Sequence, residues 1–185
     1  TADTYHPTIQ DAIDDASAND VIEVGAGNYV QTSTLNINKS VTVEGDGSGT
    51  TTLDLNALQG TTSYGITTTA DDITFSGFTI EHPASTTSTK NGFTLKAGNT
   101  SASPLNSNLV VEDLVIDGAE RTPFDFHGID GVTITDLQAD NTTSGNGINI
   151  TGCTDVDVIS FTGSNNAWGA IAVYASRPTD RGSDN

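Results

Sequence analysis

The chain repeats one eight-residue pattern four times, with apolar residues at positions 1, 3, 6 and 8. The repeats begin at residues 73, 109, 132 and 156, so successive starts lie 36, 23 and 24 residues apart. Alternating apolar residues indicate a strand with one buried face, and the two-residue offset indicates two strands that meet at a bend. A recurrence near 23 residues is typical of solenoids. The pattern therefore predicts an all-β, single-stranded parallel β-helix with its apolar positions buried. These positions are Ile73, Phe75, Phe78, Ile80, Leu109, Val111, Leu114, Ile116, Val132, Ile134, Leu137, Ala139, Val156, Val158 and Phe161, and the last repeat ends in Gly163.

Charge and composition narrow the classes of function. The chain has 6 Lys plus Arg against 24 Asp plus Glu, which gives a net charge of −18. Such an acidic chain is repelled by nucleic acid and by anionic lipid, and no apolar run is long enough to insert into a membrane. Cys153 is the single cysteine, so no internal disulfide forms, and we expect it to be a small core or turn residue. We expect an extracellular or cell-surface protein. The start, Thr-Ala-Asp, is compatible with a mature N-terminus left by signal-peptide cleavage, so the absence of a signal peptide does not exclude secretion.

The 185 residues are expected to form one domain. Ile9, Ala12, Ile13 and Ala16 share one face of a helix, so residues 8–17 are predicted to cap the first coil. Coils are then expected over residues 18–176 and a polar tail over residues 177–185. The possibility that the chain is the N-terminal part of a longer protein is left open. Before the repeats, strands are predicted at Val21–Val24, Leu35–Ile37, Val41–Val43 and Leu53–Leu55, and after them at Ala170–Ala175, with glycine-rich turns at 25–28 and 45–49.

Several N-terminal segments carry a family resemblance. They are Thr8-Ile9-Gln10, Ala12-Ile13, Val21–Val24, Gly27-Asn28-Tyr29, Lys39–Gly47 and Thr50–Leu53. Together they resemble the N-terminal part of pectin-methylesterase-like and pectate-lyase-like β-helices, over roughly residues 6–55. The resemblance implies a right-handed solenoid, in agreement with the usual hand of parallel crossovers, and we expect about seven coils. The later coils resemble generic parallel β-helix repeats of surface and polysaccharide-active proteins.

Stacking the repeats in register predicts columns of acidic residues. Asp117 and Asp140 fall in one column with Glu81 and Ser164, while Asp113 and Asp136 fall at the bend. Neighbouring strands lie about 4.8 Å apart, so such carboxylates repel one another unless they are solvated or hold a cation. Two interpretations remain open, a solvated outer face and a Ca²⁺ site, because Ca²⁺ takes several oxygen ligands. The next column, His82, Gly118, Asn141 and Asn165, is predicted to be a structural ladder of turn residues.

A dense polar cluster lies at residues 120–127. Arg121, Asp125 and His127 are candidates for acid–base chemistry on a sugar, with Asp125 and His127 on one strand face and Phe124 and Phe126 on the other. The structural alternative is a hydrogen-bonded His127 and an Arg121 paired with an acidic neighbour. Asp125–Gly128 matches the aspartate motif of the esterase-like family only in part, and its glutamine and arginine motifs are not found, so the resemblance does not extend to a complete catalytic site.

Three functions follow as hypotheses. The first is a secreted or surface module that binds polysaccharide without catalysis. The second is a self-assembling module of a surface layer, filament or adhesin, whose end-to-end contacts use an uncovered coil end. The third is the N-terminal part of a polyuronate lyase, epimerase or esterase. Two inserts, Pro83–Lys90 and Gly98–Ser107, are expected to emerge as loops that either bind a ligand or are neutral.

Overall fold

The computed structural model describes residues 4–58, 64–82, 93–99 and 105–175. The insert Pro83–Lys90, residues 100–104 of the second insert and the tail 177–185 lie outside the described residues. The described elements are α1 Ile9–Asp15, β1 Val21–Val24, β2 Gly27–Val30, β3 Leu35–Ile37, β4 Thr42–Gly45, β5 Thr51–Asp54, η1 Asn56–Leu58, β6 Tyr64–Thr68, β7 Ile73–Glu81, β8 Phe93–Ala97, β9 Asn106–Asp117, β10 Phe124–His127, β11 Ile129–Asp140, β12 Asn146–Thr151, β13 Thr154–Val158, β14 Phe161–Thr162 and β15 Gly169–Tyr174.

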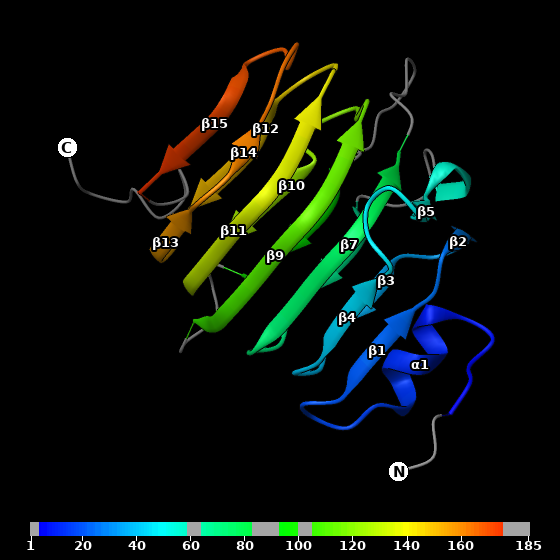
Figure 1. Ribbon diagram of the computed structural model, residues 1–185. Helices are drawn as coiled ribbons and strands as arrows, with labels where there is room; N and C mark the ends of the chain where they lie inside the picture. The colour runs from blue at the N-terminus through cyan, green and yellow to red at the C-terminus, as the bar shows by residue number, and fades with distance from the viewer. Residues whose placement is uncertain (1–3, 59–63, 83–92, 100–104, 176–185) are drawn as a thin grey trace.

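The strands form two parallel sheets (Figure 1). In the described part of the chain, sheet A has nine strands, with the path β1-β4-β7-β9-β11-β13; β2 pairs with β5, β5 also with β7, and β14 with β11. Sheet B there has six strands in the order β15-β12-β10-β8-β6-β3. From β6 to β13 the chain alternates between the sheets, and each strand pairs in parallel with an earlier strand of its own sheet. β14 follows β13 in sheet A, and both pair with β11. This all-β arrangement is compatible with a β-solenoid, and we call one passage through both sheets a repeat.

The predicted register of the long strands is confirmed. Phe75 pairs with Val111, and Val111 pairs with Ile134, so equivalent apolar positions stack on one another. Within one strand, Phe75 and Phe78 stack with ring centroids 4.9 Å apart across the bend at Gly77. These rows, together with the inward residues of sheet B, form one apolar core between the sheets.

The bend inside each long strand uses a left-handed backbone. Gly77, Asp113 and Asp136 have φ of 80°, 47° and 50° and occupy equivalent places in β7, β9 and β11. Glycine adopts this region freely, and Asp and Asn adopt it more readily than other residues do. The acidic bend residues are therefore explained in part by backbone geometry, independently of any ligand.

The apolar positions that we predicted to be buried are buried in every repeat except the last. Ile73, Phe75, Phe78 and Ile80 are at most 1% exposed, and Val111, Leu114, Ile116, Ile134 and Leu137 are also buried. Val158 is 41% exposed and Phe161 is only partly buried, so the prediction was wrong for Val158. Val158 stacks on Ile134 on one side, and no described strand of sheet A lies on the other.

The predicted helix is confirmed as α1, which packs against β1 and β3, the first strands of the two sheets. Thr8 is its N-cap and accepts a hydrogen bond from the Asp11 amide at 3.1 Å. Ile9 and Ile13 are buried, and Lys39 Nζ donates to the carbonyls of Asp14 and Ala16 at 2.5 and 2.7 Å. No helix among the described residues is long and apolar enough to cross a membrane.

Four strands were not predicted: β2, β6, β8 and β12. β2 begins at Gly27, inside the segment that we assigned to a glycine-rich turn. In β12 the outward position is Asn149 and the inward positions are Ile148 and Ile150, a clear but short alternation. Such short segments give too few alternations to be distinguished from turns by pattern alone.

Candidate functional site

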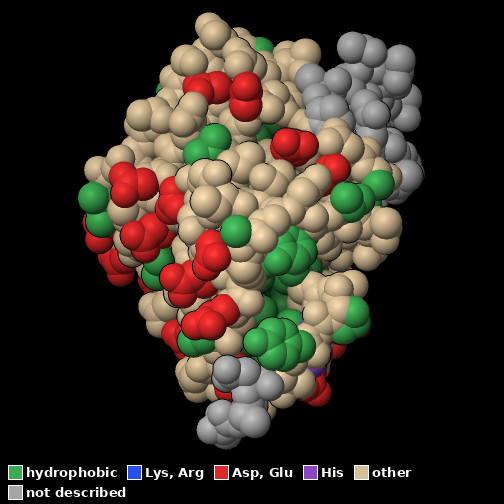
Figure 2. Space-filling model, turned by 45° about the vertical axis from the view of Figure 1, so that its right-hand side comes forward, with side chains coloured by type: hydrophobic (Ala, Val, Ile, Leu, Met, Phe, Trp, Pro, Cys, Tyr) green, Lys and Arg blue, Asp and Glu red, His purple; other side chains and the backbone are tan. Residues whose placement is uncertain are grey.

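The acidic residues are divided unequally between the two sheets. The described strands of sheet A carry twelve carboxylates and no Lys, Arg or His, whereas those of sheet B carry one carboxylate, Asp125, with Lys96 and His127. The space-filling view shows Asp and Glu side chains gathered in a band on the left of the face drawn (Figure 2). The twelve are Glu23, Glu44, Asp54, Glu81, Glu112, Asp113, Asp117, Asp130, Asp136, Asp140, Asp155 and Asp157.

An open groove of about 760 Å³ lies on the acidic face. Its residues come from the outward row Glu23, Glu44, Ser76 and Glu112, which pair in register across four strands, and from the loop after β4. The full lining is Glu23, Gly25, Glu44, Gly45, Asp46, Gly47, Ser76, Gly77, Glu112 and Asp113. This groove attracts hydrated cations and repels acidic polymers.

The four predicted calcium ligands lie in two separate pairs. Asp117 pairs in register with Asp140, and Asp113 lies beside Asp136 at the bend. The carboxylates of the first pair already accept hydrogen bonds: Asp117 from the Asn141 side chain at 2.6 Å, and Asp140 from Gln138 Nε2 at 2.6 Å and from the amide and hydroxyl of Ser164 at 2.6 and 2.7 Å. The hydrogen bond from the Ser164 hydroxyl, followed by that from Gln138, lowers the pKa of Asp140. Among the described residues, no group of three or more Asp, Glu, His or Cys is placed to hold a metal ion.

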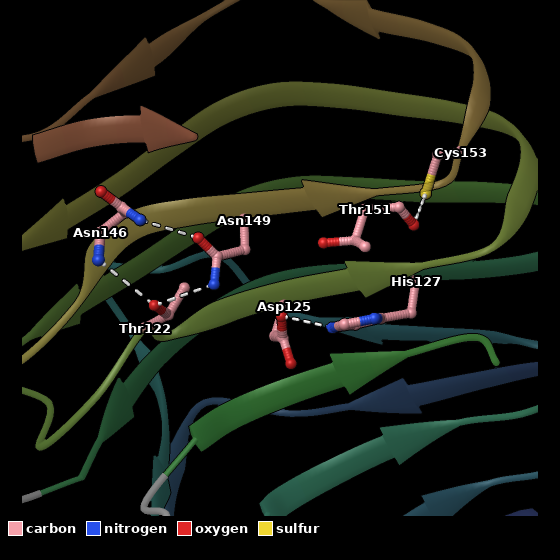
Figure 3. Close-up of polar contacts among 7 residues, drawn as sticks. All are labelled: Thr122, Asp125, His127, Asn146, Asn149, Thr151 and Cys153. Carbon is pink, nitrogen blue, oxygen red and sulfur yellow. Dashed lines mark hydrogen bonds and ion pairs between the residues drawn. The ribbon is translucent and has the colours of Figure 1, made fainter. Parts of the chain in front are cut away.

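Asp125 and His127 form a close pair on the outer face of β10 (Figure 3). His127 Nε2 lies 2.7 Å from Asp125 Oδ1, and since a carboxylate only accepts, the ring nitrogen donates. The side chains are 13% and 6% exposed for His127 and Asp125, while Phe124 and Phe126 point into the core and are fully buried. The predicted sharing of one strand face is therefore confirmed. His127 Nδ1 is buried with no hydrogen-bond partner.

A second polar group lies beside this pair, and sequence reasoning missed it. Asn146 Nδ2 donates to Asn149 Oδ1 at 2.9 Å, and Asn149 Nδ2 donates to Thr122 Oγ1 at 3.3 Å. The Thr122 hydroxyl also accepts from the Asn146 amide at 3.2 Å, which joins β12 to the segment before β10 (Figure 3). The available signal was the short alternation of Ile148 and Ile150 with their polar neighbours Asn149 and Thr151.

These residues belong to a polar row that crosses the outer face of sheet B. Asn36, Thr67, Lys96, Asp125 and Asn149 pair in register, one from each successive strand. Thr67 Oγ1 donates to Asn36 Oδ1 at 2.7 Å. We call this set the sheet B polar row. It presents amide, hydroxyl, ammonium and carboxylate groups that donate and accept hydrogen bonds along one line.

Two further residues border the row. Lys96 Nζ lies 5.1 Å from the ring centroid of Tyr64, within the range of a cation–π contact. Arg121 is partly buried and directly precedes Thr122 of the amide group. Its pairing with an acidic neighbour stays a prediction. Sheet B is thus the side of the described molecule on which Lys96, His127 and the Tyr64 ring lie beside polar side chains.

Cys153 lies near the same strands, as expected for a turn residue. It lies in the turn between β12 and β13, directly before Thr154, and its Sγ contacts the Thr151 carbonyl at 3.7 Å (Figure 3). Burial raises the pKa of the Cys153 thiol, and the negative charge of Asp125 raises it further. A thiol in this state is a weak nucleophile at neutral pH.

Comparison of the chain with protein-family models, with curated proteins and with solved structures finds no match. The resemblance of residues 6–55 to esterase-like and lyase-like β-helices therefore depends on the motifs quoted above, and the parallel sheets support a solenoid in general.

Proposed function

We propose that this protein is a secreted or cell-surface β-solenoid module that binds a polysaccharide through the outer face of sheet B. The proposal includes a right-handed parallel β-helix of about seven coils, for which the parallel pairing within each sheet and the usual hand of crossovers are the support. The observation that carries the proposed function is the sheet B polar row.

The dimensions of the row favour a polymer over a single small molecule. Five strands contribute one side chain each, and four steps of about 4.8 Å extend the row over about 19 Å. Sugars offer many hydroxyl groups that both donate and accept, and the Asn, Thr and Lys side chains of the row supply complementary partners. The Tyr64 ring, beside Lys96, adds an amphipathic surface on which a sugar ring can pack.

The charge distribution favours the same face. A polysaccharide with carboxylate groups is repelled by the twelve carboxylates of the sheet A strands, whereas on sheet B it meets Lys96 and one buried acid, Asp125. An acidic polysaccharide bound at sheet B is therefore repelled less than one bound at sheet A.

The geometry of Asp125 and His127 supports binding rather than catalysis. A general base must reach the proton that it removes. In this pair His127 Nε2 is occupied by Asp125, and His127 Nδ1 is enclosed, so neither nitrogen faces a ligand on the sheet surface. The alternative of a lyase, epimerase or esterase consequently needs catalytic groups other than this pair.

The test compares variants on the two sheets. Binding is measured by affinity gel electrophoresis against a panel of neutral and acidic polysaccharides, with Lys96→Ala and Asn149→Ala in the sheet B row. Glu112→Gln, on the exposed row of sheet A, is the control. Each sheet B variant should weaken binding about fivefold to tenfold, as expected for the loss of one hydrogen bond, and the control should not. Failure of the whole panel to bind, or equal weakening by Glu112→Gln, would refute the proposal.

A further inference from the structure

Asn149 of the sheet B polar row is held by two side chains that are themselves buried. Its Oδ1 accepts a hydrogen bond from Asn146 Nδ2 at 2.9 Å, and its Nδ2 donates to Thr122 Oγ1 at 3.3 Å (Figure 3). Thr122 is 2% exposed and Asn146 is 5% exposed, whereas Asn149 is only partly buried. A ligand on the outer face of sheet B can therefore contact Asn149, while Thr122 and Asn146 are covered by the protein.

The position of Thr122 is fixed by the backbone of the next strand of sheet B. Phe124 of β10 pairs in register with Ile148 of β12. Thr122 and Asn146 lie two residues before them, and Thr122 Oγ1 accepts a hydrogen bond from the Asn146 amide at 3.2 Å. A Cβ at Gly145 would lie 2.6 Å from Thr122 Oγ1, so a glycine at this position lets β12 begin this close to Thr122. The hydroxyl oxygen is therefore fixed against the start of β12.

The orientation of the Asn149 amide decides what this side chain offers to a ligand. An asparagine side chain has two N–H donors and an oxygen with two lone pairs. Asn149 uses one donor on Thr122 and one lone pair on Asn146, which leaves one donor and one acceptor for other partners. A half-turn of the amide would place Asn149 Nδ2 against Asn146 Nδ2, two donors with no acceptor between them. The two contacts therefore hold the remaining donor and acceptor in one arrangement.

We propose that Thr122 is a positioning residue for polysaccharide binding, because it fixes the amide that meets the sugar. This role rests on the proposed function, in which Asn149 contacts the ligand. A side chain that is already ordered need not be ordered by the ligand, so less of the binding free energy is lost on association. Without the Thr122 hydroxyl, Asn149 keeps only its contact with Asn146, and its amide turns more freely.

The binding test compares three threonine variants by affinity gel electrophoresis in galactomannan, xyloglucan, polygalacturonate and alginate. Thr122→Val removes the hydroxyl and should weaken binding about threefold, the effect expected when one side chain must be ordered by the ligand. Thr122→Ser keeps the hydroxyl and should bind like the wild type. Thr51→Val is the matched control and should leave binding unchanged. Thr51 is a buried residue of sheet A whose Oγ1 likewise accepts from a backbone amide, that of Asp46, at 2.9 Å.

A double-mutant cycle distinguishes positioning from a general effect on the fold. If Thr122 acts through Asn149, Thr122→Val should not weaken binding any further in an Asn149→Ala background. A purely structural effect of Thr122→Val would instead multiply with the loss caused by Asn149→Ala. Circular dichroism shows whether each variant folds, and Thr122→Ala replaces Thr122→Val in the cycle if the valine variant does not.

Nuclear magnetic resonance of the Asn149 side-chain amide gives a second measurement that needs no ligand. Its order parameter should decrease in Thr122→Val and be restored in Thr122→Ser. An unchanged order parameter would overturn the proposal, as would multiplicative losses in the cycle or equal weakening by Thr51→Val.

The outcomes also separate this role from the proposed function. Binding that Asn149→Ala weakens and Thr122→Val does not would refute the role of Thr122 and leave the proposed function standing. A wild type that binds none of the four polysaccharides would refute the proposed function, and the role of Thr122 in binding with it.

Discussion

Asp113 accepts two hydrogen bonds from Ser48, which precedes it by 65 residues: one from the amide at 2.9 Å and one from the hydroxyl at 2.5 Å. Asp113 lies at the bend of β9, and Ser48 lies in the loop between β4 and β5. The carboxylate therefore holds that loop at the edge of the acidic groove. Asp136, the next bend residue, has a similar φ of 50° but is exposed.

The first prediction compares Asp113→Asn with Asp136→Asn. Asparagine also tolerates the left-handed backbone, so both variants keep the bend. Asp113→Asn should lower the free energy of unfolding by about 1–3 kcal/mol, because it weakens hydrogen bonds to a charged acceptor. Asp136→Asn should stay within about 0.5 kcal/mol of the wild type. Urea denaturation followed by circular dichroism measures both, and equal effects would show that charge alone matters at the bend.

The second prediction separates backbone strain from lack of space at two glycines. Gly77 and Gly118 have φ of 80° and 79°, but a Cβ on Gly77 would lie 2.4 Å from the Gly45 carbonyl oxygen, whereas nothing lies within 4 Å of one on Gly118. Gly118→Ala should cost about 1–2 kcal/mol from the left-handed backbone. Gly77→Ala should cost this amount plus the overpacking penalty of about 1–3 kcal/mol. Thermal unfolding of the two variants tests the difference, and equal losses would argue against the close contact with Gly45.

The third prediction concerns pH. His82 is 7% exposed and its Nδ1 lies 3.3 Å from Thr94 Oγ1; burial lowers its pKa below the ordinary 6.5. Above pH 6.5 His82 is neutral in both states, so its contribution to stability is fully present. As the pH falls below 6.5, His82 binds a proton in the unfolded chain but not in the folded chain. The free energy of unfolding therefore decreases until the pH passes the lower pKa of His82 in the folded state.

The measurement is urea denaturation of wild type and His82→Asn between about pH 5 and pH 7.5, the range in which histidine titrates. The wild type should lose up to about 1.4 kcal/mol per pH unit more than the variant, which cannot titrate at this position. His6 and His127 are present in both proteins, so the comparison isolates His82. Parallel pH profiles would contradict the prediction.

The fourth prediction concerns the reactivity of Cys153. Because burial raises the pKa of the Cys153 thiol, less of the reactive thiolate is present, and the folded protein should react with a disulfide reagent at neutral pH more slowly than the chain unfolded in guanidinium. The unfolded chain should react with one equivalent, since Cys153 is the single cysteine. Equal rates in the two states would indicate that the last repeats open readily.

Several features of the fold were predictable from local pattern. The long strands β7, β9 and β11 contain enough alternating residues to identify an inward face, the position of the bend and the register between repeats. The face shared by Asp125 and His127 follows from the same alternation. The short strands β2, β6, β8 and β12 were missed because two or three alternations do not differ from a turn.

The candidate site was less predictable. The partnership of Asp113 with Ser48 depends on how a loop 65 residues away folds back, which no repeat encodes. The Asn146, Asn149 and Thr122 group likewise joins residues from two successive repeats. The unequal charge of the two sheets emerges only when each strand has been assigned to its sheet.

The alternation of inward and outward side chains along each long strand can be read from the residues alone, because it is a local property of the extended backbone. Which of the inward side chains are covered depends on how the repeats stack. Val111 and Val158 occupy the same column, but Val111 is fully buried between two neighbouring strands, while Val158 has one neighbouring strand among the described residues and is 41% exposed. Burial in a stacked sheet depends on both adjacent repeats, and no single repeat carries that information.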